Sequence, residues 1–467
     1  MQRIALTKRM RQVPPALPSE ASVQLDVERH AERLRAAGLR TLTGVISDSG
    51  GVIRAKTVPA RRIESFARSG MGASLTWPVF CVDNGIAMTP ELGVVGDLRL
   101  TADIEQAVVL DRGFGWAPAD VRDQDGELSP YCWRSVTRRQ VDRLAALGIQ
   151  ALVGNELEFG LLDESGRPLG ERDGWPCYGA GVYSELSEFA ADLCERLDDV
   201  GVPVEQIHAE YGLGQFEISL PPREPVRAAD DVLLARAVIG RTCRDHGLRV
   251  TFSPLPFSGG SGNGAHMHVS LTRNGIPLFA GGTLAEGLTA DGAHAVAGIV
   301  RHLPDAIAVL AGTVVSDERL QPGHWSGAFA CWGVENREAA VRLLLANNGN
   351  PHGANVEVKC VDSGANTYLA TGLVLGLVAL GIENELELPA AVTVDPAELT
   401  AEQARAAAVV PLPNNAAGRI ELFEKSDAVR AVLGRELHAA VLAVRRYESS
   451  LYADQDAHAL TRFAWSS

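Results

Sequence analysis

The sequence predicts an α+β protein in which a small N-terminal module precedes a larger domain. Up to about residue 125, short strand-like runs alternate with turn signals, whereas strand-like and long helical segments alternate from there to the end. The 467 residues are enough for two or three domains. With 46% hydrophobic and 22% charged residues, the chain has the composition of a globular protein with a core of its own.

A basic, proline-rich extension covers residues 1–20 and is expected to be flexible. The N-terminal module then spans residues 21–125, and the larger domain spans residues 126–467. We place the boundary between them at Asp123–Gly126, because this segment has the composition of a turn.

Apolar residues at helical spacing predict a helix over Val23–Leu39. The strands predicted in the N-terminal module are Thr41–Ile46, Gly51–Val58 and Gln106–Leu110. The long helices predicted in the larger domain are Ser187–Val200, Ala228–His246 and Ala428–Ser449. The uncharged stretch Ser363–Ile382 contains four glycines and several polar residues, so it predicts a buried helix rather than a membrane span.

Charge and cysteine content exclude several classes of function. The formal net charge is −15, which argues against binding to nucleic acid as the main task. The seven cysteines are scattered without a Cys-x-x-Cys pair, as is typical of a reducing compartment, and they form no zinc-finger spacing. The N-terminus lacks the apolar run of a secretion signal. We therefore predict a cytoplasmic protein that binds neither nucleic acid nor membranes.

Four strand-like segments in the larger domain place ionisable side chains on one face and apolar side chains on the other. These segments are Val153–Leu161, Gln215–Leu220, His266–Leu271 and Asn355–Cys360. For any one of them, a sheet face that meets water would explain the pattern. The recurrence of glutamate and histidine in all four favours a shared site instead.

The acidic residues of these segments predict a site for divalent cations. Carboxylates at positions i and i+2 repel each other unless a cation lies between them. Five glutamates and one histidine suit Mg²⁺ or Mn²⁺, because zinc usually takes more nitrogen or sulfur ligands. The six candidates are Glu156, Glu158, Glu210, Glu217, His266 and Glu357.

Two divalent ions among five carboxylates would leave a net charge of −1, so an anionic nucleotide would need further cations nearby. The candidate cations are Arg319, Arg337, Arg342 and Lys359. Metal ions together with such side chains are typical of phosphoryl transfer.

Six motifs, in this order, resemble those of the glutamine synthetase superfamily, type I branch. The resemblance covers nearly the whole chain after residue 20, and the motifs together are highly specific, although a lone Glu-x-Glu or His-x-His would be weak. The motifs are Asn155–Phe159, His208–Glu217, Pro256–Leu271, Arg319–Gly323, Asn336-Arg337 with Arg342, and Glu357–Lys359 followed by Asp362–Asn366. The resemblance implies an N-terminal β-grasp domain, a glutamine synthetase-type catalytic α/β domain with a funnel-shaped site, and a double-ring dodecamer with sites between subunits.

The resemblance also implies a role for each candidate. One metal ion would be held by Glu158, Glu210 and Glu217, and another by Glu156, His266 and Glu357. ATP would be contacted by Glu205, His268, Ser270, Arg337 and Arg342. Glutamate or the transferring phosphate would be contacted by Gly262, Arg319 and Lys359. Arg319, Arg337 and Lys359 would stabilise charge during catalysis.

The implied chemistry uses ATP as cosubstrate and two or more Mg²⁺ or Mn²⁺ ions. The γ-carboxylate of glutamate takes the γ-phosphoryl group, and an amine then attacks the resulting acyl phosphate to give an amide.

The predicted amine site departs from that of glutamine synthetases that use ammonia. The family's glutamate in the loop after Arg-Leu-x-Pro-Gly is replaced by Trp325, and the aspartate of its Gly-x-Gly-x-Asp stretch is replaced by Ser74. Ser261 stands at the family's glutamate-contacting asparagine, and Lys359 stands at an arginine, so the bidentate fork is lost. An indole face accepts an alkylammonium through cation–π and apolar contact.

These departures resemble the γ-glutamylpolyamine synthetases among the glutamine synthetase-like ligases, which predicts a polyamine substrate such as putrescine, cadaverine, spermidine or spermine. Three alternatives stay open at this point: a γ-glutamylethanolamide synthetase, an ammonia-dependent glutamine synthetase in which Trp325 is a packed aromatic, and a non-catalytic homologue. The presence of all six candidate metal ligands favours a catalyst over the last of these.

Overall fold

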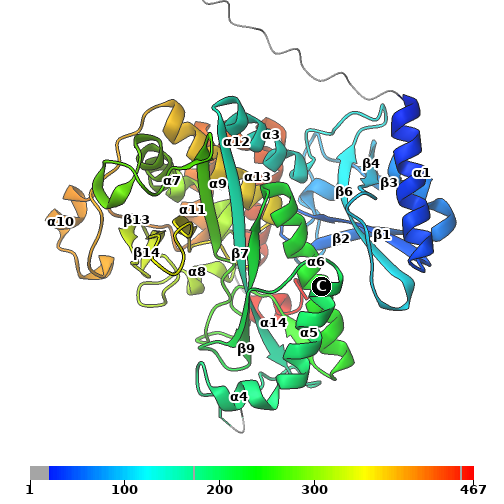
Figure 1. Cartoon of the computed structure of the whole chain (residues 1–467), viewed down its shortest axis with the longest axis horizontal. Coiled ribbons are helices and arrows are strands. Elements are labelled where there is room, and N and C mark those ends of the chain that lie inside the picture. The colour runs from blue at the N-terminus through cyan, green and yellow to red at the C-terminus, as the bar shows by residue number, and fades with distance from the viewer. Residues whose placement is uncertain (1–19, 172–173, 453–454, 467) are drawn as a thin grey trace, which may run out of the picture.

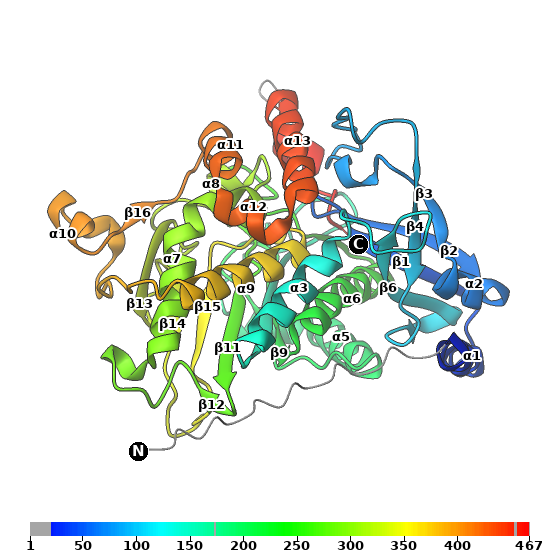
Figure 2. The same ribbon diagram turned by 90° about the horizontal axis from the view of Figure 1, so that it is seen from above.

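The computed structural model describes residues 20–171, 174–452 and 455–466, so the extension predicted for residues 1–20 lies outside the described residues except for its last one. Within the described residues, the strands form a six-stranded sheet (the N-terminal sheet) and a ten-stranded sheet (the large sheet). The N-terminal sheet lies at one end of the molecule, at the right of Figures 1 and 2. The mixed α and β architecture that the sequence predicts is confirmed.

The N-terminal sheet has the strand order β2-β1-β6-β4-β3, and β5 also pairs with β6. The pair β1 and β6 is parallel and the other pairs are antiparallel. The strands are β1 (Thr41–Ser47), β2 (Ile53–Pro59), β3 (Met71–Ser74), β4 (Asp97–Ala102), β5 (Val108–Val109) and β6 (Phe114–Arg122). Helices α1 (Glu20–Ala36) and α2 (Ile63–Arg68) pack against each other, and Phe66 of α2 is buried against Gly44 of β1.

Part of this region matches the sequence predictions. The helix predicted over Val23–Leu39 is α1, and the first two predicted strands are β1 and β2. The run Gln106–Leu110 contributes only the two-residue strand β5. Strands β3, β4 and β6 and helix α2 were not predicted. In β6, Gly115 and Pro118 interrupt the β pattern, and both residue types are unfavourable inside strands.

The large sheet has the order β16-β13-β14-β15-β11-β7-β9-β8, with β10 paired to β7 and β12 paired to β11. Its strands are β7 (Ile149–Leu162), β8 (Gln206–Ala209), β9 (Gln215–Arg223), β10 (Arg249–Thr251), β11 (Met267–Arg273), β12 (Ile276–Pro277), β13 (Phe329–Val334), β14 (Ala339–Leu344), β15 (Asn355–Val358) and β16 (Val410–Pro411). All four segments predicted to alternate between polar and apolar faces are strands of this sheet.

Helices pack around the large sheet. They are α3 (Trp133–Ala146), α4 (Ala180–Glu185), α5 (Ser187–Asp199), α6 (Pro225–Asp245), α7 (Ala290–Leu310), α8 (Ser316–Arg319), α9 (Thr367–Glu383), α10 (Ala401–Ala406), α11 (Ala416–Lys425), α12 (Asp427–Leu433), α13 (Arg435–Leu451) and α14 (Ala457–Thr461). Helix α9 is packed against α3 and α7 and corresponds to the predicted buried helix. It begins at Thr367 because the side chain of Asn366 accepts a hydrogen bond from the Leu369 N–H.

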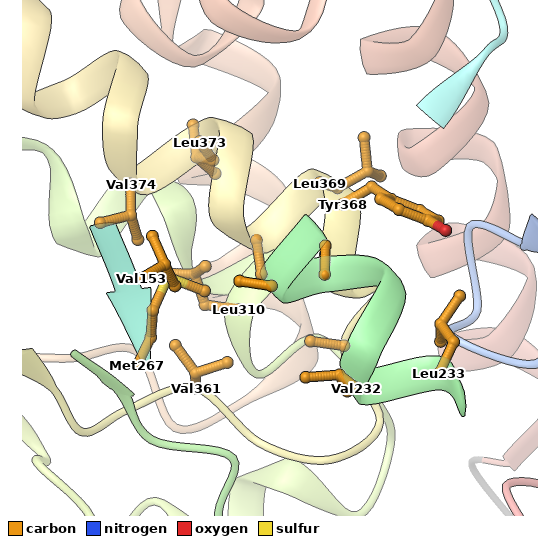
Figure 3. Close-up of a cluster of buried hydrophobic side chains, with 14 of the residues drawn as sticks. Val153, Val232, Leu233, Met267, Leu310, Val361, Tyr368, Leu369, Leu373 and Val374 are labelled. Atoms are coloured by element: carbon orange, nitrogen blue, oxygen red, sulfur yellow. The ribbon is translucent and has the colours of Figure 1, made fainter. Parts of the chain in front are cut away.

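One face of the central strands is closed by this helical layer. In Figure 3, Leu369, Leu373 and Val374 of α9 lie in one buried cluster with Val153 of β7 and Met267 of β11. The apolar halves of the alternating strands are therefore in the core. The glutamates and histidines of the same strands must point to the opposite face, because successive side chains of a strand alternate.

The continuous helix predicted over Ala428–Ser449 is wrong. The chain forms α12, breaks at Gly434 and resumes as α13. Gly434 has a φ of 88°, which glycine adopts without the steric cost that a Cβ atom would impose.

Among the described residues, α7 is long and apolar enough to cross a membrane by length and composition alone. In the fold, 72% of its most apolar window is buried against the rest of the chain. The core helix of a globular protein has the same properties.

The turn between β1 and β2 attaches the N-terminal sheet to the rest of the molecule. The Asn366 side chain donates hydrogen bonds to the carbonyl oxygens of Ser47 and Asp48, at 2.7 and 3.0 Å. Gly51 has a φ of 77°, and a Cβ atom there would lie only 2.0 Å from the Gly364 carbonyl oxygen. The turn therefore fits directly against residues 362–366, the segment that follows β15.

Four charged side chains around this turn form what we call the junction cluster: the buried Asp48, Arg445 and Glu448, and the half-buried Arg54. Asp48 pairs with Arg54 at 2.7 Å and accepts backbone hydrogen bonds from Gly50 and Val52. Glu448 pairs with Arg445 at 2.9 Å. Each carboxylate of the junction cluster thus has its own arginine.

Candidate active site

The six predicted metal ligands lie on one face of the large sheet or beside it. Strands β8, β9, β7, β11 and β15 are consecutive neighbours, so their polar side chains form one surface. In the strand register, Glu158 of β7 lies directly opposite Glu217 of β9, and His268 of β11 lies opposite Glu357 of β15. We call these six residues the sheet-face cluster: Glu156, Glu158, Glu210, Glu217, His266 and Glu357.

One half of the cluster gathers around His266. Its Nδ1 atom lies 2.9 Å from Glu156 Oε2 and 3.4 Å from Glu357 Oε1. His268 Nε2 lies 3.3 Å from the other carboxylate oxygen of Glu156. The three residues predicted to share one metal ion, Glu156, His266 and Glu357, are therefore adjacent.

The other half gathers around His208. Its Nε2 atom lies 2.8 Å from Glu210 Oε1 and 3.8 Å from Glu217 Oε1. The Tyr178 hydroxyl donates a hydrogen bond to Glu210 Oε2 at 2.9 Å, and the Tyr178 ring is stacked on His208. Glu210 and Glu217, which were predicted to share the other metal ion, are therefore brought together.

Glu158 lies between these two halves. Its Oε2 atom accepts hydrogen bonds from Gln215 Nε2 and from the Gly264 N–H, both at 2.9 Å. A Cβ atom at Gly264 would lie within about 3 Å of the side chains of His266, Arg319 and Glu158, so glycine is required at this close approach. Glu158 and Arg319 thus meet at one point of the site.

Three sets of side chains have ligand atoms that lie within 4.8 Å of one another. They are Glu156, His268 and Glu357; Glu156, Glu217 and His266; and His208, Glu210 and Glu217. Carboxylate oxygens with a few imidazole nitrogens are the donors that Mg²⁺ or Mn²⁺ accepts. His208 was not singled out from the sequence, although its period-2 relation to Glu210 is the signal that could have identified it.

The charges of the first half are balanced in part by local cations. Burial would raise the pKa of Glu156, but hydrogen bonds from His266 and His268 outweigh burial and hold this pKa below its usual value. Burial would likewise raise the pKa of Glu357, yet the Lys359 charge and the neighbouring histidines lower it to about 2. Lys359 Nζ donates to Glu357 Oε1 at 3.1 Å.

Glu217 shows the opposite behaviour. Burial and then the like charges of Glu156, Glu158 and Glu210 raise the pKa of Glu217 well above its usual value. The charge of Lys359 offsets this increase only in part, and a bound divalent cation would supply the missing positive charge. The donor set therefore fits the predicted metal ions.

The predicted cations are placed differently from one another. Arg342 donates from Nη1 to Glu357 Oε2 at 3.2 Å, and the guanidinium of Arg319 donates to the carbonyl oxygens of Lys359 and Cys360. Arg337 is exposed next to the start of β14. Arg319, Arg342 and Lys359 thus lie at the sheet-face cluster.

The residues predicted to contact ATP spread across this surface. Ser270 is half-buried on β11, two residues beyond His268 and on the same face. Glu205 is exposed directly before β8, and its backbone N–H donates to the Ser219 carbonyl oxygen of β9.

The predicted substrate contacts lie at one edge of the cluster. A Cβ atom at Gly262 would lie 2.6 Å from Arg319 Cγ, so this glycine is packed on the arginine. Trp325 is 58% exposed and has a φ of 51°, a left-handed conformation that is unusual for a bulky residue. Ser74 lies exposed on β3 of the N-terminal sheet, so within this chain it belongs to a different sheet from the metal-ligand candidates.

The fold and this arrangement of carboxylates, histidines and cations define a class of ATP-using ligases, and comparison of the sequence identifies the class. The family described as "Glutamine synthetase, catalytic domain" matches residues 130–462, so the chain belongs to the glutamine synthetase family.

Individual relatives are more specific. The chain is 40% identical over 409 residues to "Gamma-glutamylpolyamine synthetase GlnA3" from Streptomyces coelicolor, covering 86% of this chain and 88% of that protein. It is 29% identical to "Glutamate--methylamine ligase" from Methyloversatilis universalis over 83% of this chain and 87% of that protein. Among solved structures, a "novel glutamine synthase homolog" has a TM-score of 0.81 at 29% identity, covering 91% of this chain and 98% of that one.

Proposed function

We propose that this protein is an ATP-dependent ligase that joins the γ-carboxylate of glutamate to a polyamine through a γ-glutamyl phosphate. One observation carries the proposal: all six predicted metal ligands are gathered on the sheet face, while Trp325 takes the place of the family's ammonium-binding glutamate. The 40% identical relative whose name is gamma-glutamylpolyamine synthetase supports the choice of amine.

The sheet-face cluster would hold two or more Mg²⁺ or Mn²⁺ ions. In this assignment Glu158, Glu210 and Glu217 serve one ion, and Glu156, His266 and Glu357 serve another. When bound, the ions would neutralise the phosphate oxygens of ATP.

The basic side chains would help to bind glutamate and ATP alongside the metal ions. Lys359 pairs with Glu357, and Arg319 donates to the Lys359 carbonyl oxygen. Both side chains would position the glutamate carboxylate and the transferring phosphate. Arg337 and Arg342, with Glu205, His268 and Ser270, would hold the nucleotide.

Trp325 would favour a long amine over ammonium. A small, strongly hydrated cation recovers the cost of losing its water mainly through a paired carboxylate. A polyamine instead offers methylene groups to the exposed indole, each worth about 0.8 kcal/mol when buried. Its second ammonium is attracted by a protein with a net charge of −15.

The finer features of the family complete the proposal. Residues 21–125 would form a β-grasp domain and residues 126–467 the catalytic domain, assembled into a dodecamer in the cytoplasm. In that assembly, Ser74 of one subunit would face the site of its neighbour. Sedimentation of the purified protein at the mass of twelve chains would support this part.

The experiment that tests the function compares kcat/KM for ammonium, methylamine, ethanolamine, putrescine and spermine at fixed ATP, glutamate and Mg²⁺. We expect a polyamine to rank first and ammonium last. Ammonium in first place would identify an ordinary glutamine synthetase, and ethanolamine in first place an ethanolamide synthetase. Absence of glutamate-dependent phosphate release with every amine would identify a non-catalytic homologue.

A pair of variants tests the role of the loop. Trp325→Glu should raise the use of ammonium relative to putrescine, because it restores a carboxylate at the position where ammonium needs one. Trp325→Phe is the matched control, since it keeps an aromatic face and should keep the preference for putrescine. Equal preferences in both variants would contradict the assignment of Trp325 to the amine site.

A further inference from the structure

Glu338 lies beneath the loop that carries Trp325. Its side chain is buried, with 7% of the residue exposed, and its Oε1 atom accepts a hydrogen bond from the Trp325 backbone N–H at 2.9 Å. The second carboxylate oxygen, Oε2, is also buried and has no hydrogen-bond partner within the part of the chain that the structure describes. Burying a carboxylate oxygen without a hydrogen-bond donor costs free energy. A bound ligand could donate the hydrogen bond that Oε2 lacks.

Continuing the register of β14 (Ala339–Leu344) back by one residue puts Glu338 on the face that carries the sheet-face cluster. Arg342 of β14 pairs with Glu357 of β15, and the Lys359 N–H donates to the Ala340 carbonyl oxygen further along the same pair of strands. Glu338 stands one residue before β14 and is separated from Ala340 and Arg342 by steps of two, which keeps the three on one face in an extended chain.

Small residues let the Trp325 loop pack closely on this part of the face, where Ala340 and Lys359 are buried. Ala340 carries only a methyl group, and a Cβ atom at Gly327 would lie 2.9 Å from Ala340 Cα and 3.0 Å from Lys359 Cβ. The chain from Trp325 to Gly327 therefore passes from Glu338 directly to Lys359. Glu338 lies where that loop meets the phosphoryl-transfer side chains.

We propose that Glu338 is the carboxylate that receives the cationic amine and removes its proton. This inference rests on the proposed function. It means that the proton acceptor lies one residue before β14, beneath the loop and hydrogen-bonded to the Trp325 backbone, while position 325 itself offers the amine an indole in place of a carboxylate.

Proton transfer to Glu338 precedes attack of the amine on the acyl phosphate. The ammonium form of the amine gives one proton to Glu338 Oε2 and becomes neutral. The nitrogen lone pair then forms a bond to the γ-carbonyl carbon of the acyl phosphate, and the bond between that carbon and the phosphate oxygen breaks. Phosphate leaves with the electron pair and takes the remaining extra proton from the new amide nitrogen.

Other carboxylates near the loop are already engaged. Glu335 pairs with Arg342 and its side chain is half exposed, and the five glutamates of the sheet-face cluster are assigned to metal ions. Glu338 also has a structural task, because its hydrogen bond holds Trp325 in the left-handed conformation. The test must therefore separate the charge of Glu338 from this hydrogen bond.

Glu338→Gln makes that separation, because an amide oxygen still accepts the Trp325 N–H but carries no charge and takes no proton. We compare the variant with wild type using putrescine and using hydroxylamine, which is largely neutral near pH 7.5 and needs no proton removed before it attacks. Glu338→Gln should lower kcat/KM for putrescine by about 100-fold and change hydroxamate formation by less than about threefold. Glu338→Asp should recover part of the putrescine activity, since it restores the carboxylate.

Two results would overturn the inference: equal losses with both nucleophiles, which indicate a purely structural role, or full putrescine activity in Glu338→Gln. The matched control is Glu402→Gln, which removes an exposed carboxylate on α10 and should match wild type. If wild type prefers methylamine or ammonium, the polyamine assignment is wrong but the role of Glu338 is still testable. Wild type and Glu338→Gln are then compared with that amine and with hydroxylamine. A wild type without phosphate release overturns both.

Discussion

The sheet-face cluster and the junction cluster are both buried groups of charged side chains, but they are balanced in different ways. In the junction cluster two carboxylates face two arginines, and backbone N–H groups of Gly50, Val52 and Val82 complete the hydrogen bonding. On the sheet face, five glutamates lie close together. Among the described residues, Arg342 and Lys359 both pair with one of them, Glu357.

This difference separates a structural cluster from a ligand site. The junction cluster is complete within the chain, so it serves to hold two parts of the fold together. The sheet-face cluster has an excess of negative charge, and its stability as an ionised group depends on a cation from outside. Buried charge is therefore informative mainly when the chain leaves it unbalanced.

The largest expected effect comes from removing a carboxylate of the sheet-face cluster. Glu158→Ala should lower glutamate-dependent phosphate release by at least about 1000-fold, because the metal ion it helps to hold stabilises the charge of the transfer step. Metal content measured on the purified protein should fall in parallel. Full activity in this variant would contradict the assignment of Glu158 as a ligand.

Thermal unfolding sharpens the same prediction. Adding Mn²⁺ should raise the melting temperature of wild type, since a ligand that binds only the folded state stabilises it. Glu158→Ala should gain less from Mn²⁺ than wild type does, whereas its metal-free stability should be little changed because a like charge has been removed. A metal-free variant that is strongly destabilised would contradict this picture.

In the junction cluster, by contrast, removing one charged side chain should destabilise the metal-free protein. Arg445→Met leaves Glu448 buried without its cation and should lower the free energy of unfolding by about 3–5 kcal/mol. Arg445 also donates to the carbonyl oxygens of Ala308 and Ser49, so its loss affects both sides of the junction. Denaturant unfolding of the metal-free protein measures the effect.

The response to Mn²⁺ and a control variant distinguish the loss of the junction pair from damage to the metal site. The gain in melting temperature on adding Mn²⁺ should be the same in Arg445→Met as in wild type, because the metal ligands are untouched. The matched control is Arg446→Met, which removes an arginine of α13 that is half exposed. An Arg445→Met protein as stable as Arg446→Met would show that the junction pair contributes nothing.

The smallest expected effect is a pH dependence of stability from Asp48. Burial raises the pKa of this carboxyl from 3.8 to about 6 despite the charge of Arg54. Because the folded state holds the proton more tightly, this group contributes stability below about pH 4 that is lost as the pH rises through about 6.

Comparison with Asp48→Asn isolates that contribution. Between pH 4 and pH 7, the free energy of unfolding of wild type should fall by about 3 kcal/mol relative to that of Asp48→Asn. Asp125→Asn, at an exposed position in a turn, should run parallel to wild type. A constant difference between wild type and Asp48→Asn would show that Asp48 is already ionised at low pH.

The sheet-face cluster could be predicted from the sequence because its pattern is local. Period-2 alternation within each strand identified the polar face, and Glu156 to Glu158 or His266 to His268 can be read within three residues. The α+β class and the strands that carry the sheet-face cluster, apart from β8, followed from the same kind of signal. His208 was overlooked, although the same alternation connects it to Glu210.

The ion pairs of the junction cluster are local in sequence, but the attachment of the turn at residues 47–51 to the rest of the molecule could not be predicted in this way, because its contacts join residues far apart in the chain. The contact of Asn366 with Ser47 joins residues separated by 319 positions, and that of Arg445 with Ser49 by 396. The hydrogen bond from Trp325 to Glu338 is nearer in sequence, but it depends on the path of a loop that no periodicity describes. The break of the C-terminal helix at Gly434 depends on a single backbone conformation.

The close fit of Gly51 against Gly364 bears on how the molecule unfolds with heat. Since no space remains between these two backbones, the N-terminal sheet cannot separate without freeing residues 362–366, which follow directly on the strand that carries Glu357. Loss of one part should therefore remove the support of the other, and melting becomes a shared, cooperative event. Scanning calorimetry of this chain should accordingly record one heat-absorption peak in which both sheets unfold, rather than a separate early peak from the N-terminal sheet.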